Sequence, residues 1–94
     1  MARARVFLGE AQSLASQHDP ANWTISIAVQ EFAHLGHRHW SAHAIEYLGQ
    51  AAERAGQAEA AVNWYTASQD QYRNLGATRD EELLHNRLLA LLHQ

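Results

Sequence analysis

The chain has 94 residues, a formal net charge of −3 and no cysteine, and 47% of its residues are hydrophobic. This length fits one domain over residues 1–94, and the lack of cysteine excludes disulfides and thiolate metal ligands. The negative charge gives no drive towards nucleic acid or an anionic membrane surface. No apolar run approaches the ~20 residues of a membrane helix. The first residues also lack the apolar core of a secretory signal, so we expect a cytoplasmic protein.

Helix-forming residues dominate the composition, with a single proline and no Asn-Gly hairpin dipeptide, and we therefore predict an all-α fold. The chain also matches itself without a gap at an offset of forty residues. FLGEAQSLASQ (7–17) aligns with YLGQAAERAGQ (47–57), and the pair Leu35-Gly36 aligns with Leu75-Gly76. Such an internal repeat is typical of stacked helical hairpins, none of which can bury its apolar face alone.

The first unit, about residues 2–36, predicts two helices. The first covers about residues 2–17. Asp19 is a suitable cap for the second, and Pro20 fits its first position, where the missing N–H has no partner to lose. That helix is predicted to run to Leu35, where Gly36 can adopt the left-handed conformation that ends a helix.

The second unit, about residues 40–76, repeats this pattern. Trp40 or Ser41 is expected to open its first helix, with Ser41 as the cap, and Gly56 to end it. The second helix is predicted over about 58–75, with Gly76 after it. A terminal helix is predicted over about 79–93, capped by a residue within 78–80.

The repeated positions predict how the helices pack. Gly9 and Gly49 lack a Cβ, so the two helices of each hairpin can approach closely there. Larger side chains are expected to fill the space between helices: Leu8, Ile25, Ile45, Leu48 and Tyr65. Phe32 and Tyr72 lie seven residues beyond Ile25 and Tyr65 and extend the same apolar stripe.

These residues resemble the tetratricopeptide repeat, whose pattern is W-x2-L-G-x2-Y, then A-x3-F, then P. The second unit offers Ile45-x2-Leu48-Gly49-x2-Ala52 and then Ala61-x3-Tyr65. The first offers Arg5-x2-Leu8-Gly9-x2-Gln12 and then Ala21-x3-Ile25. The leading Trp, the Tyr and the closing Pro are absent, and the forty-residue period is longer than the usual period of about 34.

The resemblance implies a TPR-like solenoid of two helical hairpins and a capping helix, acting as a non-enzymatic scaffold or sensor module that binds a protein or peptide. In this family the partner contacts the first helix of each hairpin. The matching positions are Arg3, Val6, Glu10, Ser13, Leu14, His43, Glu46, Gln50, Glu53 and Arg54. The family's lysine clamp for a terminal carboxylate is absent, because the chain contains no lysine.

The last predicted helix suggests an alternative, a self-associating module or a fragment of a larger regulator. Its inward positions are Leu84, Leu88, Leu91 and Leu92. Leu83 and Leu89 are left over, and exposed leucines on a terminal helix are typical of a contact surface. We therefore expect a homodimer, or docking of an adjacent domain, through this helix.

Four of the seven histidines lie in HLGHRHWSAH (34–43), at His34, His37, His39 and His43. Imidazoles can bind zinc, copper or nickel, so a metal or pH sensor is a further alternative. The second unit has no histidine at the equivalent positions, and no carboxylate lies within the cluster, so we expect no metal site. His37 and His39 are expected to be exposed.

No motif predicts catalysis. Ser13 and His18 are close in sequence, but nothing orients them as nucleophile and base. We expect no enzymatic activity, no catalytic residue and no cofactor. The three tryptophans, Trp23, Trp40 and Trp64, are predicted to pad junctions between helices or to staple a helix start.

Overall fold

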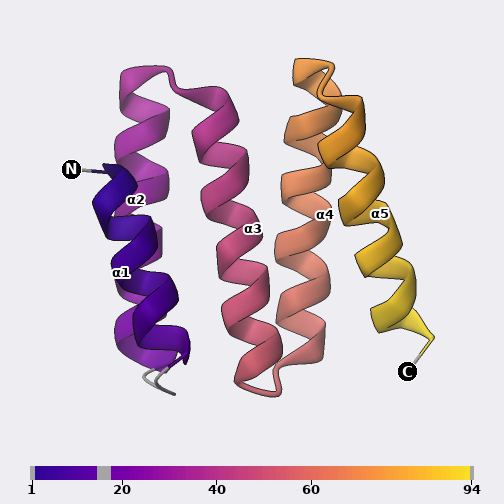
Figure 1. Cartoon of the computed structure of the whole chain (residues 1–94), viewed down its shortest axis with the longest axis horizontal. Coiled ribbons are helices and arrows are strands. Elements are labelled where there is room, and N and C mark those ends of the chain that lie inside the picture. The colour runs from indigo at the N-terminus through magenta and orange to yellow at the C-terminus, as the bar shows by residue number, and fades with distance from the viewer. Residues whose placement is uncertain (1, 15–17, 94) are drawn as a thin grey trace.

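The computed structural model describes residues 2–14 and 18–93, and this part of the chain is entirely helical apart from short connections, which confirms the all-α fold (Figure 1). The helices are α1 (Ala2–Leu14), α2 (His18–Leu35), α3 (Arg38–Arg54), α4 (Ala58–Leu75) and α5 (Thr78–Leu92). Within the described ranges, no helix has both the length and the apolar character needed to cross a membrane.

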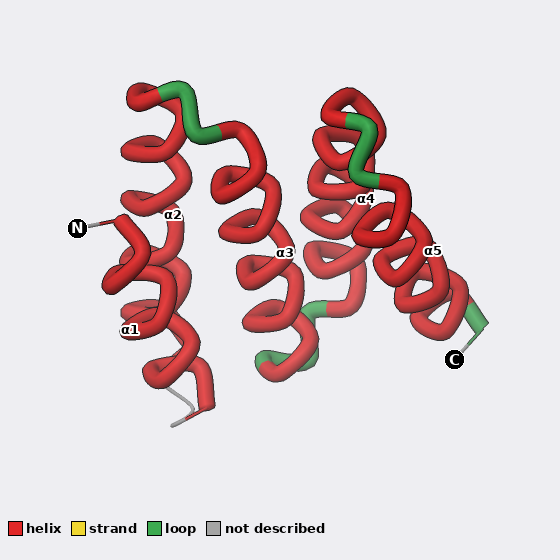
Figure 2. The backbone as a smooth tube through the Cα atoms, turned by 45° about the horizontal axis from the view of Figure 1, so that its top comes forward, coloured by secondary structure: helices red, strands yellow, loops and turns green. Residues whose placement is uncertain are grey.

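Helices that follow one another in the chain also lie side by side, each running back along the one before it (Figures 1 and 2). α3 additionally contacts α1, so the second hairpin rests on both helices of the first. The molecule is a thin slab of 31 × 30 × 16 Å. A slab of this shape leaves two broad faces available to solvent or to a partner.

The forty-residue offset recurs in the helix bounds. α4 begins and ends forty residues after α2, and α5 begins forty residues after α3. Gly36, Gly56 and Gly76 have φ of 75°, 74° and 72°, which is the left-handed conformation. Each lies at the end of a helix, as predicted, because only glycine adopts this conformation without steric cost.

The predicted starts of α2 and α3 and the predicted cap of α5 were wrong, whereas α4 begins at Ala58, as predicted. α3 begins at Arg38, and Ser41 is a buried residue inside it rather than its cap. α2 already includes Asp19, and the N-caps of α3 and α5 are His37 and Ala77, neither with a side-chain cap bond. Backbone hydrogen bonds that follow Gly36 and Gly76 explain why these helices begin without a polar cap.

At both turns the backbone bonds of a Schellman motif end one helix and start the next within two residues. The His37 N–H donates to Phe32 O at 2.9 Å, and the Ala77 N–H donates to Tyr72 O at 2.9 Å. No polar cap residue is therefore needed for the chain to re-enter a helix.

The core consists of two clusters of buried side chains. One joins α3, α4 and α5 and contains Ala42, Ala52, Ala61, Tyr65, Tyr72, Leu84 and Leu88. The other joins α1, α2 and α3 and contains Val6, Ile25, Ala28, Phe32, Ala44 and Leu48. The predicted stripe of Ile25, Phe32, Tyr65 and Tyr72 is thus buried, whereas Leu48 packs against the first hairpin rather than beside Tyr65.

Several predicted core or junction residues are exposed instead. Leu8 is 53% exposed, although its repeat equivalent Leu48 is 3% exposed, because α1 and α2 cover Leu48 and no described helix covers Leu8 in that way. Leu92 and Trp23 were expected to be covered and are also exposed. Trp40 lies within α3 and stacks on Phe32 with ring centroids 5.7 Å apart.

Candidate functional site: the α3–α5 face

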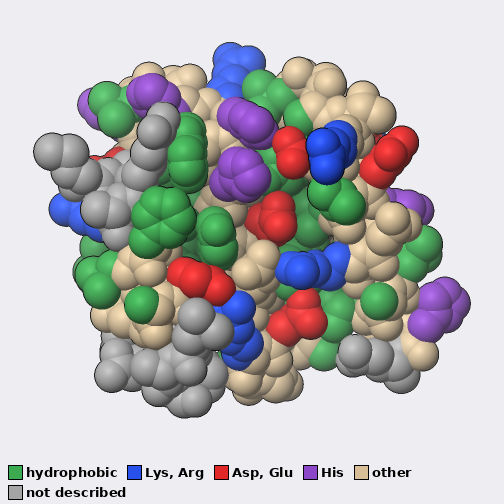
Figure 3. All heavy atoms as spheres, in the orientation of Figure 1, with side chains coloured by type: hydrophobic (Ala, Val, Ile, Leu, Met, Phe, Trp, Pro, Cys, Tyr) green, Lys and Arg blue, Asp and Glu red, His purple; other side chains and the backbone are tan. Residues whose placement is uncertain are grey.

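Charged and histidine side chains gather over the middle of one broad face of the slab (Figure 3). We call this the α3–α5 face, because its side chains come from those two helices and meet over two tyrosines of α4. Its α3 residues are His39, His43, Glu46, Gln50, Glu53 and Arg54. Its remaining members are Tyr65 and Tyr72 of α4 and Asp80 and Arg87 of α5.

Tyr65 connects the three helices at one end of the face. Its ring is fully buried, while its hydroxyl donates to Glu53 and Arg87 Nη1 lies 3.5 Å from the same oxygen. The Arg87 guanidinium also lies 5.7 Å from the centre of the Tyr65 ring, within the range of a cation–π contact. Burial, followed by the bond to Glu53, raises the pKa of Tyr65 above its usual range.

A shallow pocket of about 200 Å³ opens beside Tyr65 and is lined by Gln50, Glu53, Arg54 and Arg87. Arg54 Nη2 donates to Glu10 Oε1 of α1 at 2.7 Å, and this bond raises the pKa of the guanidinium. The pocket therefore offers two guanidinium groups, a carboxylate and an amide. Its guanidinium groups can donate hydrogen bonds to a carboxylate, and its amide can both donate to and accept from a peptide backbone.

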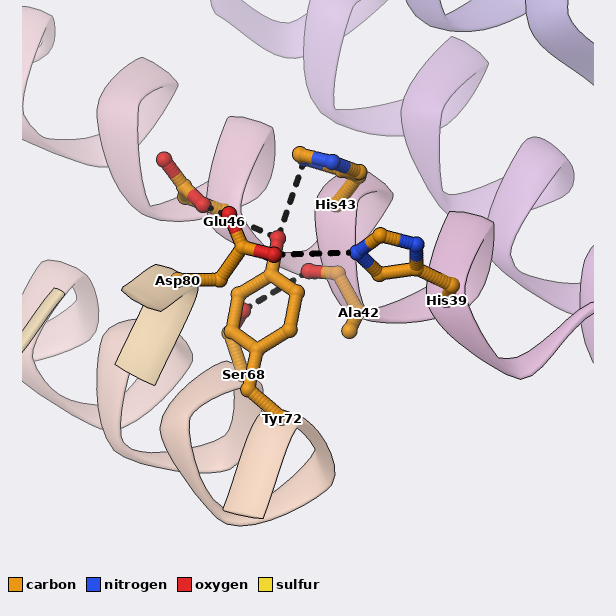
Figure 4. A network of polar contacts seen from close by, with 7 residues as sticks. All are labelled: His39, Ala42, His43, Glu46, Ser68, Tyr72 and Asp80. Atoms are coloured by element: carbon orange, nitrogen blue, oxygen red, sulfur yellow. Dashed lines mark hydrogen bonds and ion pairs between the residues drawn. The ribbon is translucent and has the colours of Figure 1, made fainter. Parts of the chain in front are cut away.

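Tyr72 connects the helices at the other end of the face (Figure 4). Its hydroxyl donates to Glu46 Oε1 at 3.1 Å and lies 2.9 Å from His43 Nδ1. Beside it, His39 Nε2 lies 3.0 Å from Asp80 Oδ2. Burial is the main reason why the pKa of Tyr72 is raised, and the negative charge of Glu46 adds to it.

α3 and α4 are joined directly beneath this network. Ser68 is fully buried, and its hydroxyl donates to the carbonyl oxygen of Ala42 at 2.7 Å (Figure 4). Ala42 directly precedes His43 on α3, and Tyr72 lies one turn beyond Ser68 on α4. The bond therefore fixes the position of His43 along the helix axis relative to Tyr72.

Six of the ten positions predicted to contact a partner belong to this face or reach it: Glu10, His43, Glu46, Gln50, Glu53 and Arg54. Val6 is fully buried in the first core cluster and offers no surface. The side chains of Arg3, Ser13 and Leu14 lie outside the described residues. Asp80 and Arg87 of α5 were not predicted as site residues. The repeat register gave no signal for Arg87, since it aligns with Tyr47 of α3, which is not one of the predicted contact positions.

Of the four clustered histidines, only His39 and His43 are brought together, with ring centroids 5.0 Å apart. His37 and His39 are exposed, as predicted. His34 lies in the last turn of α2 and is also exposed. The fold therefore brings together two of the four imidazoles, with the Asp80 carboxylate of α5 beside them.

Leu83 and Leu89, the predicted self-association residues, are 61% and 41% exposed. They lie six positions apart on α5, so their side chains point about 120° apart around the helix. Leu89 and Leu92 point only about 60° apart. The exposed leucines of α5 therefore do not form one stripe, and Leu89 shares its side of the helix with Leu92 rather than with Leu83.

Comparison of the chain with protein-family models, with curated proteins and with solved structures found no match.

Proposed function

We propose that the chain is a non-enzymatic, TPR-like helical module that binds a segment of a partner protein across the α3–α5 face. The observation that carries this proposal is the pocket lined by Gln50, Glu53, Arg54 and Arg87. Four helices contribute to it or support it, since Glu10 of α1 holds Arg54 of α3 and Tyr65 of α4 contacts both Glu53 of α3 and Arg87 of α5. Side chains held in this way lose little freedom on binding, which favours recognition.

The pocket favours a segment with an acidic group. Among the described residues Arg87 forms no ion pair, and its contacts are with Tyr65. Its guanidinium can therefore receive a carboxylate in bidentate geometry, either from an acidic side chain or from a chain terminus. Gln50 can bond to the peptide backbone beside it.

Selection from a displayed library of random peptides tests this proposal. The library should yield binders rich in Asp or Glu, and Arg87→Ala or Gln50→Ala should weaken their binding. The matched control is Gln30→Ala, an exposed glutamine of α2. Binders that tolerate both substitutions on the face, or a library that yields no binder, would contradict the proposal.

Self-association through α5 is a second candidate, and the repeat register favours it. At the forty-residue offset, Leu89 and Leu92 align with Gly49 and Ala52, which are buried in the second hairpin. Ala52 belongs to the core cluster shared with α4. Two exposed leucines thus occupy positions that a neighbouring helix covers elsewhere in the same chain, and a second copy of the chain could supply such a helix.

A further inference from the structure

His39 and His43 lie one helical turn apart on α3. Because α3 begins at Arg38, both residues are inside the helix, and a separation of four places their side chains on the same side. Two histidines at this spacing on one helix are a known zinc-binding arrangement. Their ring centroids are 5.0 Å apart and the rings are tilted by 36°, so the imidazoles lie beside each other above Tyr72.

Asp80 supplies a third donor from a different helix. It lies in the first turn of α5, and its Oδ2 is 3.0 Å from His39 Nε2 (Figure 4). One donor atom from each of His39, His43 and Asp80 lies within 4.8 Å of the other two. Tetrahedral zinc with bonds of ~2.1 Å separates its ligands by ~3.4 Å, so side-chain adjustments of about 1 Å would close the site.

The hydrogen bonds around Tyr72 prepare His43 as a ligand. The hydroxyl has one proton, which it donates to Glu46 Oε1. In the 2.9 Å hydrogen bond between Tyr72 and His43, Nδ1–H of the histidine is therefore the donor and the tyrosine oxygen is the acceptor. This tautomer of His43 has a free lone pair on Nε2. A metal-binding histidine commonly donates its other N–H to a fixed acceptor, and this bond sets the orientation of the ring.

We infer that His39, His43 and Asp80 form a binding site for a divalent transition metal ion of the zinc class. Two neutral imidazoles and one carboxylate are a donor set that zinc accepts, and the partial exposure of all three leaves a fourth position for water. The ion would replace the hydrogen bond between His39 and Asp80. This inference does not depend on the proposed peptide binding.

Metal binding would strengthen the connection between α3 and α5. α5 packs against α4 but has no close backbone contact with α3 among the described residues, so the ion would replace the hydrogen bond between His39 and Asp80 with metal–ligand bonds that join the two helices. A ligand that binds only the folded chain raises its apparent stability. Zinc should therefore raise the melting temperature as well as bind.

Calorimetric titration of untagged protein with zinc chloride tests the site, with His39→Ala and Asp80→Asn as site variants. The matched controls are His37→Ala and Asp70→Asn, which change an exposed histidine and an exposed aspartate elsewhere. We expect one ion per chain in the wild type and both controls, and affinity at least about tenfold weaker in each site variant. Circular dichroism of every variant establishes that it is folded before titration.

Cobalt(II) provides a second readout at the same site. Four- or five-coordinate cobalt absorbs visible light more strongly than the hydrated ion, so the wild type should develop a band that Asp80→Asn abolishes and Asp70→Asn retains. The inference is overturned if the wild type does not bind zinc stoichiometrically. It is equally overturned if folded Asp80→Asn and His39→Ala bind the ion as tightly as the controls do.

Discussion

A Cβ atom placed on Gly49 of α3 would lie 2.5 Å from the Cδ1 and Cε1 atoms of Tyr65 on α4. This contact sets the distance between the two helices, because Tyr65 is fully buried and its ring cannot turn away. The same ring carries the hydroxyl that binds Glu53 on the α3–α5 face. This close crossing of α3 and α4 therefore also positions the candidate site.

Gly49→Leu should destabilise the protein. Overpacking a core typically costs ~1–3 kcal/mol, which exceeds the gain of up to ~1 kcal/mol from replacing a helical glycine. Urea denaturation should show a lower midpoint than for the wild type. Ala90→Leu, at an exposed position of α5, is the control and should leave the midpoint nearly unchanged. Equal midpoints for both variants would refute the assigned crossing.

The helix ends could be predicted from the sequence, because a left-handed glycine is a local feature. Gly36, Gly56 and Gly76 each lie where the pattern placed the end of a helix. The start of α3 could not be predicted, because backbone bonds across the turn before it replaced the polar cap that the sequence rules require. That error of two to three residues put His39 in a loop and hid its alignment with His43.

The candidate site was predicted only where its residues lie on α3. Asp80 is separated from His39 by 41 positions, and only the packing of α5 on α4 brings them together. Tyr65 and Tyr72 were recognised as apolar core residues, but their buried hydroxyls bond to Glu53 and Glu46 of the α3–α5 face. A sequence pattern indicates that the ring is buried and gives no information on which side chain the hydroxyl binds.

Ser68→Ala should cost about 1 kcal/mol, because the buried hydroxyl bonds to Ala42 O across two helices and a net hydrogen bond contributes ~0.5–1.5 kcal/mol. Thr66→Ala is the matched control. Its hydroxyl also donates to a backbone carbonyl, that of Val62, but it is exposed and its bond stays within one helix. We expect less than ~0.5 kcal/mol for the control. Chemical denaturation measures both, and a cost for Thr66→Ala as large as that for Ser68→Ala would argue against this role for Ser68.

Stability should fall as the pH rises above ~10, the ordinary pKa of tyrosine. Tyr65 and Tyr72 have raised pKa values in the folded chain, so they stay protonated there while the unfolded chain loses protons. Each group then removes up to ~1.4 kcal/mol of stability per pH unit in this range. Tyr72→Phe should make the decline of unfolding free energy between pH 10 and 12 shallower by about this slope. A slope identical to that of the wild type would show that Tyr72 is not responsible.

Self-association through α5 predicts a difference between two leucine variants. Leu89→Glu should give a monomer at concentrations where the wild type is dimeric, because Leu89 shares its side of the helix with Leu92. Leu83→Glu should leave the dimer intact, since it points about 120° away. Light scattering after size exclusion measures the mass of each. A wild type that is monomeric at high micromolar concentration excludes the homodimer.

The central claim is that a partner segment binds across the α3–α5 face, and amide chemical-shift mapping with the strongest library peptide tests it most directly. We predict that the largest shifts occur at Gln50, Glu53, Arg54 and Arg87, with little change at Gln30 of α2. Shifts confined to α2, or to the surroundings of Leu89 on α5, with none on the α3–α5 face, would contradict the claim.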